Sequence, residues 1–171
     1  MARGVYAGSF DPPTNGHLWL ISKGVELFDE LYVAAALNPD KKYDFSIEER
    51  VRMLKEITKE YPNTIVDRFE DLYLVDHAAS VGAKYILRGI RTEEDYEYEY
   101  KMKHFNQVLN PEIESVFLMP PKELEDLSSS FVKGLIGPRG WEEVIRKLVP
   151  TPVYNAILEK YNYKRTRKRR A

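Results

Sequence analysis

The chain has 171 residues, of which 43% are hydrophobic and 31% are charged, a composition that fits one globular domain with an ordinary core. It has no cysteine, which excludes a disulfide framework and a thiolate metal site. It also has no apolar run near the roughly 18 residues of a membrane span, and none long enough near Met1 for a signal peptide. We therefore expect a soluble, cytoplasmic protein that has no membrane partner.

The formal net charge of −1 hides an uneven distribution of charge. Residues 164–170, "KRTRKRR", include six basic residues and no acid, so the rest of the chain has 20 basic against 27 acidic residues. Such a run is typical of a solvated, disordered tail, although a basic tail can also bind nucleic acid or an acidic surface. We expect a single domain over residues 1–163 and a basic, disordered tail over residues 164–171, without a nucleic-acid partner.

Short apolar runs alternate with helical patterns along the chain. The predicted strands are residues 4–8, 31–37, 64–69, 84–89 and 115–119. The predicted helices between them are residues 16–28, 46–61, 73–82 and 92–109. From residue 128 onward the sequence predicts helical segments with breaks at 137–140 and 150–152. The second helix opens with a capping box, Ser46 and Glu49, and Pro62 ends it. The predicted fold class is α/β: a doubly wound, Rossmann-like, five-stranded parallel sheet with helices on both faces and extra C-terminal helices.

Polar and basic side chains follow the carboxyl ends of these strands, where a doubly wound sheet binds its ligands. Ser9 and His17 follow the first strand, Lys41 follows the second, "RGIR" at 88–91 follows the fourth, and three serines at 128–130 come after the fifth. Arginines, lysines, hydroxyls and helix N-termini at one edge of a sheet suit a polyphosphate ligand. The spacings of a Walker A loop and of a G-x-G-x-x-G fingerprint are both absent from the sequence.

The stretch "GSFDPPTNGH" at 8–17 resembles the T/H-x-G-H signature of the nucleotidylyltransferase superfamily. Within it, the chain resembles the bacterial phosphopantetheine adenylyltransferases over about residues 3–160, through "NPDKKYDFSIEER", "ILRGIR", "DYEYEYKMKHFN", "ESVFLMP" and "LSSSFVK". The resemblance implies transfer of AMP from ATP to 4′-phosphopantetheine, giving dephospho-coenzyme A and pyrophosphate in coenzyme A biosynthesis. It also implies Mg²⁺ bound with ATP, a homohexamer, and coenzyme A as a feedback inhibitor.

The resemblance implies a role for each matching residue. His17 matches the family's contact to the α-phosphate, and Ser9 matches its bridge between the two substrates. Lys41 and Arg88 match the residues that hold the acceptor phosphate, and these four residues form the implied catalytic set. The implied ATP-binding residues are Ser9, Phe10, His17, Gly89, Ile90, Arg91, Glu99, Leu124, Glu125, Asp126, Leu127, Ser128, Ser129 and Ser130. The implied phosphopantetheine-binding residues are Ser9, Lys41, Leu74, Arg88 and Asn106, and no metal ligand is assigned.

Two departures from the family pattern leave alternatives open. The stretch "FEDLYLVDHAA" is one residue longer than usual, so the pantetheine contact is Leu72, Tyr73 or Leu74, and residues 124–126 replace an aromatic and small polar residues. One alternative function is adenylyl transfer to another acceptor such as nicotinate mononucleotide, which needs aromatic stacking rather than a narrow apolar slot after the third strand. Another is a nucleotide-binding regulator that uses its basic tail on nucleic acid. A pure binder has no need of an α-phosphate histidine, and this argues against the regulator.

Overall fold

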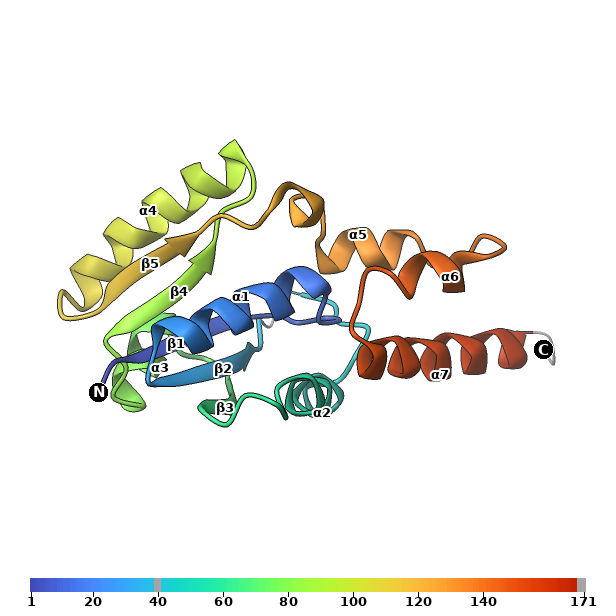
Figure 1. Ribbon diagram of the computed structural model, residues 1–171, viewed down its shortest axis with the longest axis horizontal. Helices are drawn as coiled ribbons and strands as arrows, with labels where there is room; N and C mark the ends of the chain where they lie inside the picture. Colours follow the sequence, from blue (N-terminus) through green and yellow to red (C-terminus); the bar gives the residue numbers. More distant parts are fainter. Residues whose placement is uncertain (39–40, 169–171) are drawn as a thin grey trace.

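The computed structural model describes residues 1–38 and 41–168, in which strands and helices alternate (Figure 1). The strands are β1 (Arg3–Gly8), β2 (Glu30–Ala36), β3 (Thr64–Phe69), β4 (Tyr85–Gly89) and β5 (Glu114–Leu118). The helices are α1 (Asn15–Leu27), α2 (Ile47–Ile57), α3 (Leu74–Ser80), α4 (Glu93–Leu109), α5 (Ser129–Gly134), α6 (Trp141–Ile145) and α7 (Thr151–Lys168), with a short 3₁₀ helix at Lys122–Leu124.

The strands form one parallel sheet in the order β3-β2-β1-β4-β5, which confirms the predicted doubly wound fold. β1 is the central strand, and its register pairs Gly8 with Ala35 of β2 and Tyr6 with Leu87 of β4. The chain builds β2 and β3 on one side of β1 and then crosses to build β4 and β5 on the other. The crevice between the carboxyl ends of β1 and β4 is therefore the topological switch point, where such sheets bind ligands.

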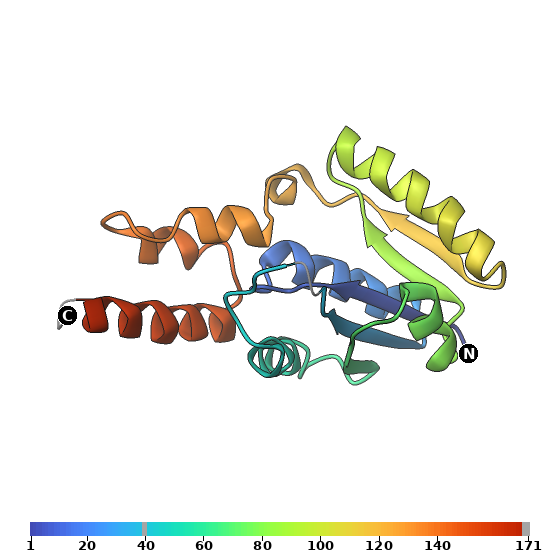
Figure 2. The ribbon, with the colours of Figure 1, turned by 180° about the vertical axis from the view of Figure 1, so that it is seen from behind.

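Each face of the sheet buries its own apolar layer. Leu87 of β4 packs in one cluster with Ile21 of α1 and Leu54 of α2, whereas the adjacent Ile86 packs in another with Ala78 of α3. Neighbouring residues of a strand point to opposite faces, which explains why a fully apolar strand serves two cores. α1 crosses the face nearer the viewer in Figure 1, and α3 lies on the opposite face, which Figure 2 shows from behind.

The C-terminal helices α5, α6 and α7 lie beyond the carboxyl ends of the strands (Figure 1). α7 is attached to α2 through Lys160, whose Nζ lies 2.8 Å from Oε2 of Glu49 and 4.6 Å from the centroid of the Phe45 ring. Because α7 runs to Lys168, the backbone of residues 164–168, where the tail was expected to begin, is helical. Residues 169–171 lie outside the described residues, so a disordered tail stays a prediction.

The predicted strands agree with the observed ones to within one residue at each end. α2 ends earlier than predicted: after Thr58 the chain continues in turns, in which the Tyr61 N–H donates to the carbonyl oxygen of Thr58 at 2.9 Å and the Thr64 N–H to that of Tyr61 at 3.1 Å. Pro152 lies in the first turn of α7, where a missing N–H costs nothing, rather than interrupting a helix. Within the described ranges, no helix has the length and apolar character needed to cross a membrane.

Gly4 of β1 packs against the ring of Phe28, which is itself stacked on Tyr85. A β-carbon at position 4 would lie 2.6 Å from Cδ2 of Phe28. We expect Gly4→Ala to lower the free energy of unfolding by about 1–3 kcal/mol, because a confined ring has to move. Gly134→Ala is the matched control: nothing lies within 4 Å of its β-carbon, so it should be neutral or stabilising by up to about 1 kcal/mol. Urea unfolding measures both, and wild-type stability in Gly4→Ala would contradict this packing.

Candidate active site

The loop between β1 and α1 holds a strained turn at the switch point. Phe10 is fully buried and has a φ of +48°, a left-handed conformation that bulky residues rarely adopt. Its ring meets that of His17 edge-on, with 5.1 Å between centroids. Arg50 of α2 is also fully buried, and its Nη1 donates to the carbonyl oxygens of Ser9 at 2.6 Å and Ala36 at 3.2 Å. Packing and a buried guanidinium together hold this turn in place.

A hydrogen bond from the backbone fixes the tautomer of His17. Thr14 caps α1: its hydroxyl accepts from the His17 N–H at 3.4 Å, and its own backbone N–H donates to Nδ1 of His17 at 2.9 Å. Because a backbone N–H can only donate, Nδ1 is unprotonated and a neutral ring has its proton on Nε2. His17 lines a cavity at the switch point, and the ring therefore offers that cavity an N–H donor.

The surroundings of His17 also keep it neutral. Burial lowers its pKa to about 4, and the positive charge of Arg91 acts in the same direction. The folded-state pKa is therefore below the value of about 6.5 expected in the unfolded chain. As pH falls through the window from about 6.5 to about 4, the unfolded chain gains a proton that the folded chain does not, and the stability that depends on neutral His17 is lost.

Arg88 lies at the carboxyl end of β4 and is held by a buried carboxylate. Its Nε donates to Oε1 of Glu99 at 2.8 Å, its Nη2 donates to the same oxygen, and its Nη1 donates to the carbonyl oxygen of Ala7 at 3.1 Å. Burial acts against the charge, but the Glu99 carboxylate outweighs it and keeps the pKa of Arg88 above its ordinary value. The guanidinium is thus a permanent, oriented positive charge at the end of the sheet.

Arg91 is fixed by the first turn of α4. Its Nε donates to Oδ2 of Asp95 at 2.9 Å and its Nη2 to Oδ1 at 3.3 Å, and its backbone N–H also reaches Oδ2 at 3.1 Å. The hydroxyl of Thr92 caps the helix by accepting from the Asp95 N–H at 3.2 Å. Asp95 was not predicted as a site residue, although the spacing of four residues between an arginine and an aspartate at a predicted helix start was a usable signal.

Two cavities meet at the carboxyl ends of β1 and β4. The larger has a volume of about 930 Å³ and the smaller of about 290 Å³. The residues that line both cavities are Ala7, Gly8, Ser9, Lys41 and Arg88. Three of the four residues predicted as catalytic therefore lie at the boundary between the cavities, and the fourth, His17, lines the smaller one.

The larger cavity brings together every residue predicted to bind the acceptor. They are Ser9, Lys41, Leu74, Arg88 and Asn106. Leu72 and Tyr73, the other two candidates in the segment with the extra residue, line the same cavity. The sequence analysis missed Met102 and Phe105 of α4, which share a helix face with Asn106 and could have been found by helical periodicity.

The smaller cavity brings together most of the residues predicted to bind ATP. They are Ser9, Phe10, His17, Gly89, Arg91, Leu124, Leu127, Ser128, Ser129 and Ser130. Four others do not line it: Ile90 is buried, Glu99 pairs with Arg88 beside the larger cavity, and Glu125 and Asp126 lie outside the lining. A nucleotide contact for these four stays a prediction.

The serines before and within α5 differ in what they can donate. The hydroxyl of Ser128 caps the helix by accepting from the Phe131 N–H at 3.0 Å, which leaves its proton to donate elsewhere. The hydroxyl of Ser129 donates to the carbonyl oxygen of Pro12 at 2.8 Å, so its proton is already used within the protein. Ser128 is therefore better suited than Ser129 to donate to an anionic ligand in this cavity.

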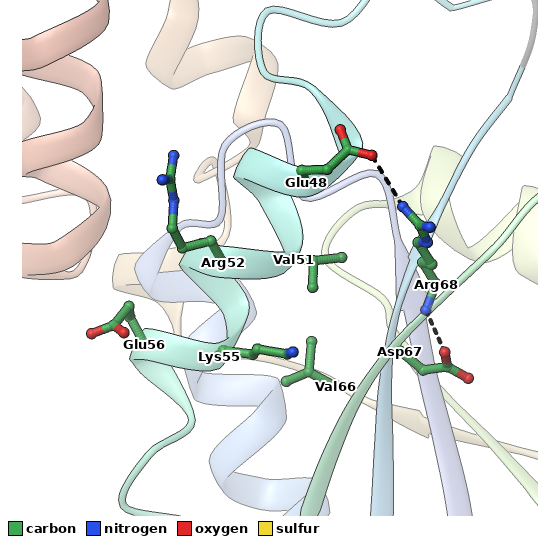
Figure 3. Close-up of a pocket in the computed structure, with 8 residues that line it drawn as sticks. All are labelled: Glu48, Val51, Arg52, Lys55, Glu56, Val66, Asp67 and Arg68. Atoms are coloured by element: carbon green, nitrogen blue, oxygen red, sulfur yellow. Dashed lines mark hydrogen bonds and ion pairs between the residues drawn. The ribbon is translucent and has the colours of Figure 1, made fainter.

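A third cavity, of about 570 Å³, lies between α2 and β3 (Figure 3). Val51 and Val66 face each other in it, and Nη1 of Arg68 donates to Oε1 of Glu48 at 3.1 Å. No residue predicted to bind a substrate lines it. Because its lining mixes charges of both signs, this groove does not suit a polyphosphate as the switch point does.

The tautomer and pKa of His17 can be measured directly. We expect its ring to stay neutral, with the proton on Nε2, from pH 8 down to about pH 5, because burial and Arg91 oppose a second proton. Nitrogen-15 NMR of the imidazoles, assigned with a His17→Asn variant, measures both properties, and a free histidine peptide titrating near 6.5 is the control. A His17 midpoint near that of the peptide, or a proton on Nδ1, would contradict the geometry.

Known proteins match nearly the whole of this chain in sequence. The cytidylyltransferase-like family model matches residues 5–134. The phosphopantetheine adenylyltransferase of Chromobacterium violaceum is 57% identical over 162 residues, which are 95% of this chain and 99% of that protein. The enzyme of the same name from Neisseria meningitidis serogroup B is 53% identical over 94% of this chain and 95% of its own.

Solved structures share the fold at much lower identity. The nicotinic acid mononucleotide adenylyltransferase of Plasmodium falciparum, complexed with NaAD, aligns with a TM-score of 0.68 and 18% identity over 94% of this chain and 96% of that one. At such identity the match supports the fold alone, whereas the matches above 50% identity over nearly the whole chain establish the family. This chain belongs to the phosphopantetheine adenylyltransferase family of the cytidylyltransferase-like nucleotidylyltransferases.

Proposed function

We propose that this chain transfers AMP from Mg²⁺–ATP to 4′-phosphopantetheine, releasing pyrophosphate and forming dephospho-coenzyme A in coenzyme A biosynthesis. The observation that carries the proposal is the pair of cavities whose linings share Ser9, Lys41 and Arg88. One substrate in each cavity brings the acceptor phosphate and the α-phosphate of ATP to the shared boundary. Positioning of this kind accounts for much of the rate enhancement in phosphoryl-type transfer.

The acceptor supplies its own nucleophile. A phosphate monoester has a second pKa of about 6, so it is largely dianionic at neutral pH and needs no general base. Arg88, kept charged by Glu99, and Lys41 are placed to hold this phosphate at the boundary. One of its oxygens attacks the α-phosphorus in line, the bond from that phosphorus to the bridging oxygen of the β-phosphate breaks, and pyrophosphate leaves.

His17 acts as a neutral hydrogen-bond donor in this proposal. Its Nδ1 is engaged by Thr14, so the Nε2 proton is available to a non-bridging oxygen of the α-phosphate. Negative charge that develops on this oxygen strengthens the hydrogen bond in the transition state, and a preorganised donor in a buried site costs little reorganisation. Arg91, fixed by Asp95, adds positive charge on the same side.

We propose that Mg²⁺ enters the site with ATP. Mg²⁺ is commonly held by substrate phosphates, waters and at most one or two carboxylates. Within the described residues, no group of three or more histidine, aspartate or glutamate side chains could hold a metal. The ion would neutralise charge on the outer phosphates, and this chain's own residues would orient the α-phosphate.

The wall of the larger cavity offers apolar length to a long, flexible acceptor arm. Leucines at 37, 72 and 74 and Met102 line it, together with the rings of Phe69, Tyr73, Tyr98 and Phe105. A pantetheine arm needs apolar length of this kind. The naming of the relatives at 53–57% identity supports pantetheine as well.

We extend the proposal to the oligomeric state and to feedback inhibition, because the chain resembles this family. A cytoplasmic homohexamer is the expected form. Feedback inhibition by coenzyme A has a physical basis in the two adjoining cavities, because that molecule joins a pantetheine arm to an adenine nucleotide and matches both kinds of lining at once.

The acceptor is tested by measuring pyrophosphate release from Mg²⁺–ATP with 4′-phosphopantetheine and nicotinate mononucleotide side by side. We expect release with phosphopantetheine alone, since the wall offers its arm apolar length and the relatives at 53–57% identity are named for this acceptor. Release with the nicotinate compound alone would overturn the acceptor, and release with neither would overturn the proposed reaction.

His17→Ala tests the donor at the α-phosphate. We expect kcat to fall by about 10²- to 10³-fold while the affinity for ATP changes by no more than about threefold, because the lost hydrogen bond strengthens only in the transition state. His104→Ala, an exposed histidine of α4 that lines neither cavity, is the control and should keep wild-type kinetics. Wild-type turnover in His17→Ala would remove His17 from the mechanism.

A further inference from the structure

Asp11 is a buried carboxylate that lines neither cavity yet connects the segments that do. It follows Phe10 in the loop after β1, and its side chain is 4% exposed. Oδ1 accepts from the backbone N–H of Phe45 at 2.8 Å, and Oδ2 accepts from the backbone N–H of Asp44 at 3.0 Å. Nζ of Lys133 completes the set with a bond to Oδ2 at 2.9 Å.

Lys133 comes from α5 on the far side of this carboxylate. Its Nζ also lies 3.7 Å from Oδ2 of Asp44, and its side chain is 25% exposed. α5 includes Ser129 and Ser130, which line the smaller cavity. The ion pair therefore attaches the helix that bears these serines to the loop after β1.

Each of the three segments joined at Asp11 contributes lining residues to the cavities. The loop after β1 contributes Ser9 to both cavities. The segment that Asp11 holds at Asp44 and Phe45 follows Lys41 by only a few residues, and Lys41 lines both cavities as well. A buried carboxylate with three donors is expensive to disturb, because any lost partner leaves charge or a backbone N–H unsatisfied.

We propose that Asp11 and Lys133 are positioning residues. Together they determine the positions of α5 and of the Lys41 segment, residues 41–45, relative to the loop after β1. The inference rests on the proposed function. Lys133 acts first through α5 on the nucleotide side, with a longer contact of 3.7 Å to Asp44, whereas Asp11 holds the segments of both sides directly. Loss of either changes substrate affinity without removing a group that touches a substrate.

Variants of the two residues should have different defects in ligand binding. Lys133→Met keeps the two backbone N–H donors to Asp11, so the chain should fold, but α5 loses its charged attachment. We expect its Kd for Mg²⁺–ATP to rise about tenfold and its Kd for 4′-phosphopantetheine to rise by no more than about threefold, because the contact to Asp44 is longer than that to Asp11. Asp11→Asn replaces an acceptor oxygen by an N–H donor that faces another N–H or an ammonium. It should therefore weaken the binding of both ligands. Lys133→Arg should restore ATP affinity to within about threefold of wild type.

Isothermal titration calorimetry with each ligand alone separates these effects from simple instability. A partly unfolded sample lowers the number of binding sites, whereas a displaced segment raises the Kd at full stoichiometry. Lys23→Met is the matched control, because Lys23 forms an ion pair of similar length, 2.8 Å to Glu26, on the exposed side of α1. It should bind both ligands as the wild type does.

The outcomes decide the proposal independently of turnover. Unchanged Kd values in Lys133→Met, or a loss of stoichiometry alone in both variants, would reduce the pair to a structural role and overturn the inference. A failure of the wild-type chain to bind either ligand would overturn the proposed function instead.

Discussion

The guanidinium of Arg88 lies at the switch point of the sheet, and the geometry of the site depends on the groups that bind this charge. A buried guanidinium without partners would be costly, so its position is determined by the acceptors around it. Glu99 on α4 takes two of its N–H groups and the carbonyl oxygen of Ala7 at the end of β1 takes a third. One side chain thereby ties β4 to β1 and to α4 at the point where the two cavities meet.

Neighbouring residues of the site differ in charge: Arg88 and Arg91 are cations, whereas His17 is neutral. Arg88 and Arg91 are each fixed by a carboxylate of α4, and burial together with the charge of Arg91 keeps His17 neutral. In the proposed reaction, a neutral imidazole with its proton on Nε2 donates to an α-phosphate oxygen without adding a further cation to Lys41, Arg88 and Arg91. Asp95, which holds Arg91, thus acts indirectly on the form of the histidine.

Much of the fold was predictable because its signals are local. Apolar runs gave the strands, and the capping box of Ser46 and Glu49 is observed with both hydrogen bonds present. The residues of the two cavities were predictable from a motif and from the topology that brings strand ends together. The role of Asp11 and the pairing of Glu99 with Arg88 were not, because they depend on partners 122 and 11 residues away in the sequence that only the folded chain brings into contact. That α7 continues through Lys168 was not predicted either, since a basic run does not by itself end a helix.

The geometry of His17 also restricts the kind of transfer that the site can perform. A covalent nucleotidyl-enzyme would require a nitrogen lone pair directed at the α-phosphorus. Nδ1 is directed back to the Thr14 N–H, and Nε2 carries the proton, so neither nitrogen of the neutral ring can attack. No other nucleophile is needed if the acceptor phosphate lies in the adjoining cavity. Direct transfer between two substrates bound together then follows, and this explains why the boundary residues Ser9, Lys41 and Arg88 belong to both cavities at once.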